Sequence, residues 1–223
     1  MDVTPVEAAD AALTLILIPL TDAVLMPGTI MPLAIGRPAV AAALQDAART
    51  ERHIAVVFQR EPFAEVPGLD ELQSIGTEAR LLRYFTGRDG SHHAIVQGIG
   101  RIRIENMAEN GQYSSVNVRR VAEPDASGAE IDARIHQIRE RSLQILRLID
   151  QDPLELTSTI RSIDGAGALA DFVTGLLDLT LAEKQEIFDA AELMPRLDLV
   201  ITRLSNRERP GNGHHEPGQS QSS

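Results

Sequence analysis

The chain has 223 residues, of which 43% are hydrophobic and 24% charged, with a formal net charge of -11. This apolar fraction can fill a core, so wholesale disorder is excluded. The chain contains no cysteine, which excludes disulfides, zinc ribbons and a thiol nucleophile. The negative charge argues against general affinity for nucleic-acid backbone or anionic membranes. No apolar stretch approaches the roughly 20 residues of a membrane span, so we expect a cytoplasmic protein without a membrane partner.

The first half of the chain has the pattern of a β domain. Short apolar runs separated by Gly, Pro and Asn predict strands at 13–20, 30–35, 54–59, 75–85, 92–97, 101–107 and 115–121. Residues 87–90 (Gly-Arg-Asp-Gly) predict a hairpin turn, and the alternation of Arg and Ile over 101–104 predicts isoleucines on one face and arginines on the other. One helix, with Pro38 in its first turn, interrupts the strands. We predict a flexible terminus at 1–12 and a β subdomain at 13–123.

After residue 124 the apolar residues recur with the period of about 3.6 that is typical of an α-helix. Apolar residues including Ile131, Ile135 and Ile138 mark one face of a long helix, which ends before Pro153. Further helices are predicted at about 154–163, 168–178, 181–191 and 195–207, with Pro195 opening the last one. Thr180 and Glu183 fit a capping box. We therefore predict a helical subdomain at 124–207, followed by a disordered tail at 208–223.

Motifs for catalysis and cofactor binding are weak. Lys184 is the single lysine, and no Gly-rich phosphate loop precedes it. Residues 165–170 fit Gly-x-Gly-x-x-Ala, but a helical stretch precedes them where a dinucleotide site requires a strand. They are better interpreted as a turn between helices. The six histidines lack a metal-ligand spacing. We therefore predict no cofactor, no metal site and no catalytic residue.

A local excess of arginine remains to be explained. Residues 75–121 of the β region carry seven arginines against four acidic residues, and the arginines are Arg80, Arg83, Arg88, Arg101, Arg103, Arg119 and Arg120. One interpretation is a basic face for RNA. The other, which we favour, is a solvated sheet face, because the aromatic platform of single-strand binders is missing.

Several separated segments, in order, resemble one family. Residues 18–28 (Ile-Pro-Leu-Thr-Asp-Ala-Val-Leu-Met-Pro-Gly) and 31–37 (Met-Pro-Leu-Ala-Ile-Gly-Arg) are similar to the opening of the Lon protease N-terminal domain. The likeness continues through the Gly-Thr-Glu-Ala segment at 76–79 and the Gly-Ile-Gly-Arg segment at 98–101. It extends into the helical half, at 169–172 and 179–186, and so covers about residues 13–206.

This resemblance implies an α+β fold, with a PUA-like β pseudobarrel followed by a C-terminal helical bundle. It also implies a non-enzymatic module that selects unfolded or degron-bearing polypeptides for ATP-dependent proteolysis. The ATPase and protease modules of Lon are not in this sequence, which we interpret as a stand-alone domain or a fragment. Two alternatives stay open: an adaptor or assembly protein acting on a full-length Lon protease, and an RNA-binding PUA-like module. Self-association is a further expectation, since the family module supports hexamer assembly.

The candidate substrate-binding residues lie mainly in one apolar, proline-rich segment. They are Leu25, Met26, Pro27, Ile30, Met31 and Pro32, with Phe63 from the following loop and Arg37 from the matched Gly-Arg motif. Prolines hold a segment extended and methionine packs against varied partners, which suits weak binding of unrelated chains. We predict that at least Met26 and Phe63 are exposed. The alternative for Leu25, Ile30 and Met31 is ordinary core packing.

Overall fold

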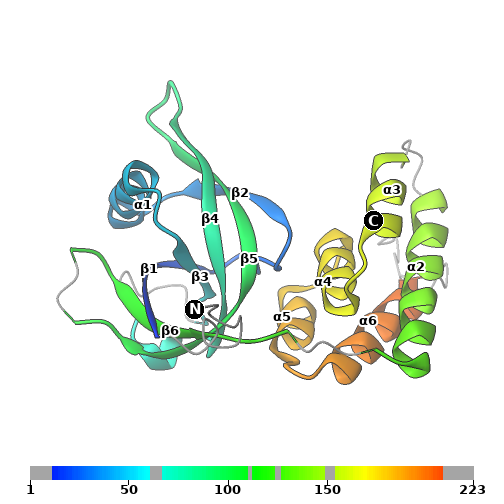
Figure 1. Cartoon of the computed structure of the whole chain (residues 1–223). Helices are drawn as coiled ribbons and strands as arrows, with labels where there is room; N and C mark the ends of the chain where they lie inside the picture. Colours follow the sequence, from blue (N-terminus) through cyan, green and yellow to red (C-terminus); the bar gives the residue numbers. More distant parts are fainter. Residues whose placement is uncertain (1–11, 61–66, 110–111, 124–126, 149–153, 208–223) are drawn as a thin grey trace, which may run out of the picture.

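The structure, a computed structural model, describes residues 12–60, 67–109, 112–123, 127–148 and 154–207. The predicted flexible terminus, apart from residue 12, and the predicted disordered tail lie outside these ranges. Figure 1 shows two parts side by side, one built mainly of strands and the other of helices. We call residues 13–120 the β part and residues 129–207 the helical part. The predicted α+β class is therefore confirmed.

Six strands form one curved sheet in the β part. They are β1 (Leu13–Leu20), β2 (Ile30–Ile35), β3 (Ile54–Phe58), β4 (Ile75–Thr86), β5 (His92–Met107) and β6 (Ser115–Arg120). Their order is β2-β5-β4-β3-β1-β6, and β5 also pairs with β6. This second pairing closes five strands into a ring, which removes their free edges, and leaves β2 beside β5 as the edge strand. The arrangement is that of a pseudobarrel.

Strand β5 corrects one sequence-based prediction. The glycines at 98 and 100 suggested a break between two strands, but residues 92–107 form one strand. Its first half pairs with β2 and its second half with β6. A Cβ added at Gly98 would lie 2.4 Å from the carbonyl oxygen of Met26. Gly98 is therefore explained by close approach of another backbone segment, a recurrent use of glycine within strands.

Helix α1 (Pro38–Thr50) covers one opening of the ring and packs against its aliphatic interior. Pro38 stands in its first turn, as predicted, because proline lacks an N–H that this position does not need. The buried face of the helix comprises Ala41, Ala43, Leu44 and Ala47. The three-residue 3-10 helix η1 (Leu69–Glu71) precedes β4.

The helical part contains α2 (Ala129–Leu148), α3 (Leu154–Ser162), α4 (Ala166–Leu176), α5 (Leu181–Asp189) and α6 (Leu193–Arg207). The capping box of Thr180 and Glu183 is confirmed at the start of α5. Pro195 does not open α6 but is its third residue, within the first turn that proline tolerates. Among the helices described, none is long and apolar enough to cross a membrane.

Candidate functional site

The segment after β1 was predicted to form an exposed rim, and the structure places its centre inside the molecule. Leu25 and Met26 are 2% and 1% exposed. The Thr77 hydroxyl donates a hydrogen bond to the Leu25 carbonyl at 2.6 Å, and the Thr29 hydroxyl donates one to the Met26 carbonyl at 2.7 Å. The prediction that Met26 is exposed is therefore wrong, because the bond from Thr77 of β4 holds the segment against the sheet.

Met26 packs where the β part meets the helical part. It belongs to a buried cluster with Val24, Ile75 and Phe188. Since Phe188 comes from α5 and Ile75 from β4, this cluster is shared by the two parts. Met26 thus contributes to the fixed contact between them and not to an open surface.

A buried ion pair lies beside this apolar contact. The Arg101 guanidinium of β5 donates to both carboxylate oxygens of Asp171 in α4, at 2.5 and 2.7 Å. Its Nε donates to the Phe188 carbonyl at 3.1 Å, and its Cζ lies 4.9 Å from the centre of the Phe188 ring. Arg101 and Asp171 are only 3% and 2% exposed. Buried charges require such pairing and hydrogen bonding.

Two more charged residues complete this cluster. Arg196 of α6 is buried and donates to the Glu123 carboxylate at 2.7 Å and to the carbonyls of Ala190 and Ala191. Glu123 also lies 3.8 Å from Arg101, measured from Oε2 to Nη1. We call Arg101, Glu123, Asp171 and Arg196 the buried ion-pair cluster; three of the four are buried, and the Glu123 side chain is 45% exposed. The cluster joins the sheet, the segment after β6 and two helices.

The cluster explains the glycine motif at 165–170. Gly165 precedes the first turn of α4, as the interpretation of a turn between helices requires. A Cβ added at Gly167 would lie 1.9 Å from Oε1 of Glu123, so a side chain there would displace the carboxylate. The positive end of a helix dipole favours an anion at this place, and here the anion is Glu123.

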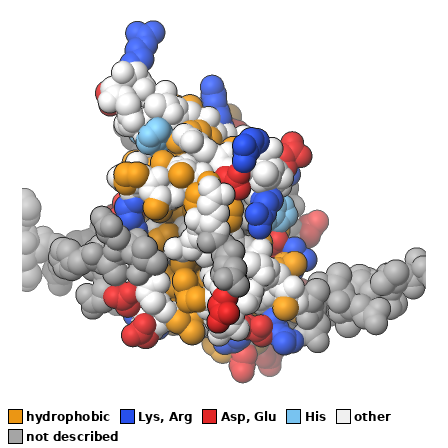
Figure 2. Space-filling model, turned by 90° about the vertical axis from the view of Figure 1, so that its left-hand side faces the viewer, with side chains coloured by type: hydrophobic (Ala, Val, Ile, Leu, Met, Phe, Trp, Pro, Cys, Tyr) orange, Lys and Arg blue, Asp and Glu red, His pale blue; other side chains and the backbone are white. Residues whose placement is uncertain are grey.

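Six of the seven arginines are exposed, as the favoured interpretation of a solvated face predicts, and Arg101 is the exception. Arg101 is buried instead of solvated, because the helical part covers its side of the sheet. Arg120 donates two hydrogen bonds to Glu78, which lower the pKa of that carboxyl group, and Arg119 pairs with Glu105. Figure 2, which views the β part from the side away from the helices, shows basic side chains interspersed with acidic ones. Three of the seven arginines, Arg101, Arg119 and Arg120, thus have carboxylate partners.

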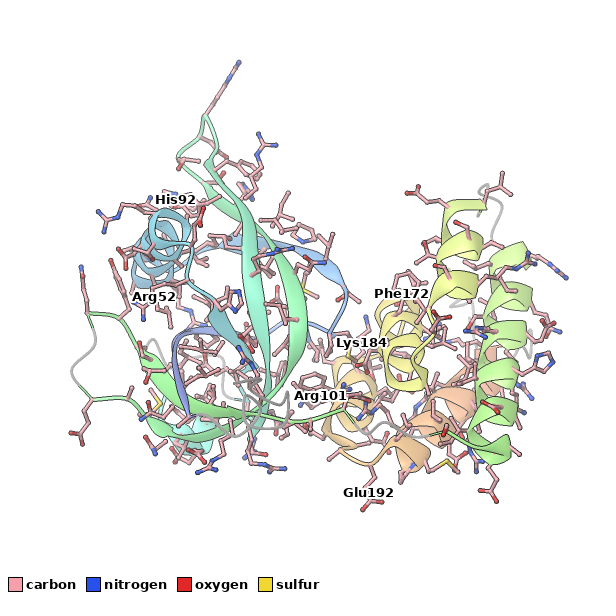
Figure 3. All side chains as sticks on the ribbon, viewed as in Figure 1. Arg52, His92, Arg101, Phe172, Lys184 and Glu192 are labelled. Carbon is pink, nitrogen blue, oxygen red and sulfur yellow. The ribbon has the colours of Figure 1, made fainter. Side chains whose placement is uncertain are left out.

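A hollow of about 340 Å³ opens between the two parts, near the buried ion-pair cluster. It is lined by Val24, Gly28, Thr29, Ile30, Met31, Pro32, Phe172, Gly175, Leu176 and Lys184. Ile30 and Leu176 are 59% and 42% exposed. Figure 3 places Phe172 and Lys184 at the edge of the helical part that faces the sheet. We call this space the inter-part hollow.

The predicted site residues other than Leu25 and Met26 lie in several different places. Ile30 and Pro32 are exposed, and Met31 is half-buried, all at the hollow; core packing therefore does not hold for Ile30. Arg37 lies elsewhere, where its Nη2 donates to the Pro19 carbonyl at 3.3 Å and to the Gln59 amide oxygen at 3.1 Å. Pro27 is half-buried between Met26 and Gly28. Phe63 lies outside the described residues.

Sequence reasoning missed the helical side of the hollow. Phe172 and Leu176 belong to α4, and Lys184 to α5. The sequence offered three signals: the aromatic Phe172, the apolar residues at the end of the predicted helix around Leu176, and the single lysine, Lys184. None of these shows that α4 and α5 lie opposite β2, which comes much earlier in the sequence.

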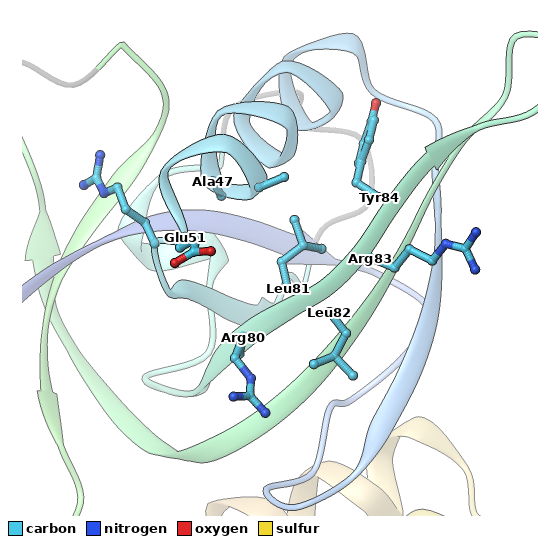
Figure 4. Close-up of a pocket in the computed structure, with 9 residues that line it drawn as sticks. Ala47, Glu51, Arg80, Leu81, Leu82, Arg83 and Tyr84 are labelled. Atoms are coloured by element: carbon cyan, nitrogen blue, oxygen red, sulfur yellow. The ribbon is translucent and has the colours of Figure 1, made fainter.

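A larger hollow, of about 450 Å³, lies between α1 and β4. Figure 4 shows Leu81 directed toward the helix and Leu82 directed away from it. The lining of this hollow includes Glu51, Arg52, Arg80 and Arg83, so both positive and negative charges are present. Arg80 donates to the Gln97 amide oxygen at 2.7 Å. Because four charged residues line this hollow, the more apolar inter-part hollow is the stronger candidate for binding.

The chain matches the family model of the ATP-dependent protease La (LON) substrate-binding domain over residues 14–206. It is 36% identical over 193 residues to the Lon protease of Methylocella silvestris, covering 86% of this chain and 24% of that protein. The Lon protease of Escherichia coli is 26% identical over 189 residues, with coverages of 85% and 24%. The chain therefore spans about a quarter of the length of these relatives.

Solved structures show the same fold. The N-terminal domain of a Mycobacterium avium complex Lon protease superimposes with a TM-score of 0.74 at 24% identity, covering 87% of this chain and 99% of that one. A Lon N-terminal domain protein from Xanthomonas campestris gives a TM-score of 0.59 at 19% identity, with coverages of 85% and 98%. With the family match over most of the chain, these findings show that it belongs to the LON substrate-binding domain family.

Proposed function

We propose that this chain is a non-enzymatic polypeptide-binding domain, and that unfolded or degron-bearing proteins bind to it through apolar segments in the inter-part hollow. The observation that carries this proposal is the exposure of Ile30 and Leu176 on opposite walls of one hollow. Isolated exposed apolar residues are common on proteins, whereas apolar residues gathered in one concave site point to a ligand. The description of the matched family as a substrate-binding domain agrees with this role.

The chemistry of the lining suits weak and adaptable binding. Ile30, Met31 and Pro32 come from the edge strand and Phe172 and Leu176 from α4, so apolar side chains of a ligand meet apolar surface on two sides. Full burial of one large aliphatic side chain contributes about 1.5–3 kcal/mol. Part of this is offset by the ordering of the bound chain. Binding without strong dependence on sequence follows from such nondirectional contacts.

Degradation itself requires modules beyond this sequence. The single lysine, Lys184, does not follow a Gly-rich phosphate loop, and no Gly-x-Ser-x-Gly segment is present. We therefore assign ATP hydrolysis and peptide-bond cleavage to a Lon protease with which this domain acts, either within one polypeptide or as a partner. The contribution of this domain is to hold the substrate.

The test is a titration of a fluorescently labelled, permanently unfolded polypeptide against the wild-type chain and the double variant Ile30→Ser/Leu176→Ser. Fluorescence anisotropy should show at least about a tenfold loss of affinity, which corresponds to roughly 1.4 kcal/mol. Both side chains are exposed, so the variant should keep its thermal stability. Leu154→Ser is the matched control, because Leu154 is 71% exposed and lies on α3, outside the hollow. Equal losses in the two variants, or none in either, would contradict the proposed site.

A further inference from the structure

Among the described residues that line the inter-part hollow, Lys184 is the only charged one, and none is acidic. It is half-buried near the start of α5. Within the described part of the chain, its ammonium group has no ion pair or hydrogen bond. The other walls are mainly apolar, so this cation stands alone beside a site that we assign to apolar segments.

We propose that Lys184 makes the hollow selective for apolar segments that carry an aspartate or glutamate side chain. This inference rests on the proposed function, and it specifies which polypeptide segments that site prefers. The argument is charge complementarity: the described lining supplies one unpaired positive charge and no negative charge. An acidic side chain flanked by large aliphatic residues matches both features.

Desolvation of the Lys184 ammonium explains why an acidic segment should bind more tightly than a purely apolar one. A purely apolar occupant would remove water from the Lys184 ammonium without replacing the lost hydrogen bonds, which is unfavourable. A carboxylate of the occupant restores both a hydrogen bond and an opposite charge, and such charge-assisted bonds are stronger than neutral ones.

The neighbouring acidic residue of α5 does not neutralise Lys184. Glu183 accepts hydrogen bonds from the backbone N–H and the hydroxyl of Thr180, both at 3.0 Å, and it pairs with Arg203 at 3.3 Å. Its carboxylate is therefore committed to the helix cap and to α6. The positive charge of Lys184 remains available to a ligand.

The carboxylate is assigned to a side chain of the bound segment and not to a chain terminus. Capture of a terminal carboxylate usually needs free backbone N–H groups grouped together. On the rim of the hollow, the Gly28 N–H already donates to the Gly98 carbonyl at 3.0 Å. The Thr29 N–H donates to the Met26 carbonyl at 3.2 Å. The rim thus offers a side-chain ammonium, while these two backbone donors are already engaged.

The test uses two labelled peptides that differ only in a central Glu or Gln flanked by leucine and isoleucine, with both termini blocked. The wild-type chain should bind the Glu peptide about fivefold more tightly than the Gln peptide at low ionic strength. Lys184→Met should remove this preference while still binding the Gln peptide, and Lys184→Arg should retain it. The four affinities of wild type and Lys184→Met form a double-mutant cycle, which isolates the Lys–Glu contact. A third peptide with Gln and a free carboxyl terminus distinguishes side-chain from terminal capture.

Because the chain contains a single lysine, reductive ¹³C-methylation labels one side chain and preserves its positive charge. The methyl resonance of Lys184 should shift when the Glu peptide is added and shift much less with the Gln peptide. Equal affinities of the wild-type chain for Glu and Gln peptides, or a preference that survives in Lys184→Met, would overturn the inference. Tighter binding of the free-terminus peptide would overturn the side-chain assignment. Failure of every peptide to bind would contradict the proposed function itself.

Discussion

The interface between the two parts, which we call the seam, has a closed region and an open one. In the closed region, Arg101 and Asp171 are buried and hydrogen-bonded, and Met26 packs against Phe188 beside them. In the open region, Ile30 and the other lining residues leave a hollow of about 340 Å³. Helices α4 and α5 therefore meet the β part in two different ways, closely against β4 and β5 and more openly against β2.

The two regions differ in whether water or a ligand can reach their side chains. Separating a buried bidentate ion pair leaves buried charges without sufficient compensation, so the pair fixes the position of the helices relative to the sheet. An apolar wall that is open to solvent can still make new contacts with an incoming chain. We infer that the closed region holds α4 and α5 in place, and that this placement keeps the open region available for a ligand.

The largest expected effect comes from removing the centre of the closed region. Asp171→Ala leaves the buried Arg101 and Arg196 with less compensating charge, and removal of one partner of a buried pair typically costs about 3–5 kcal/mol. Urea denaturation should show this loss as a lower free energy of unfolding. Asp198→Ala is the control, because Asp198 also pairs with an arginine, Arg134, but on the surface; it should cost at most about 1 kcal/mol. Similar losses in both variants would show that the buried pair does not fix the seam.

Met26→Ala tests the apolar half of the closed region. Met26 is 1% exposed, so truncation should create a cavity and cost about 2–5 kcal/mol. Ile30→Ala supplies the contrast from the open region, because Ile30 is 59% exposed and its truncation should change stability by at most about 1 kcal/mol. Thermal unfolding measures both variants. Comparable stability of the two would contradict the distinction between closed and open regions.

An ion pair inside the β part adds a contrast that depends on pH. Hydrogen bonds from Arg120, the largest cause, and from His53 lower the pKa of the buried Glu78 carboxyl below its ordinary value. Because the folded-state pKa is lowered, the stabilisation is present above the ordinary pKa and is lost as the pH falls through the folded-state value. Glu78→Gln should therefore cost about 2 kcal/mol near neutral pH.

The stability difference between wild type and Glu78→Gln should shrink as the pH falls below the ordinary pKa of glutamate and through the lowered folded-state pKa of Glu78. Urea denaturation at several pH values measures it. Arg119 and Glu105 form a more exposed pair on neighbouring strands, so Glu105→Gln is the matched control and should show a small difference throughout. A difference for Glu78→Gln that does not depend on pH would contradict the assigned cause.

Local patterns predicted most secondary structure well because they depend on nearby residues. The runs of apolar residues marked β1 and β2, and the Thr180–Glu183 spacing marked the start of α5. The prediction failed at β5, where glycines were interpreted as a break. It also failed for Met26, because a proline-rich segment can lie on a rim or inside a seam with the same local pattern. Thr77, 52 positions away from Leu25, decides between these places.

The α+β class, the order of most elements and, through several matched segments, the family could all be inferred from the order of amino acids. Period and capping are properties of neighbouring residues, so they can be interpreted without a structure. Two placements required the folded molecule: Arg101 is an internal ion-pair partner, and Lys184 faces the same hollow as Ile30. Burial and charge pairing depend on which distant segments exclude water from a side chain, and that exclusion exists only once the two parts are packed together.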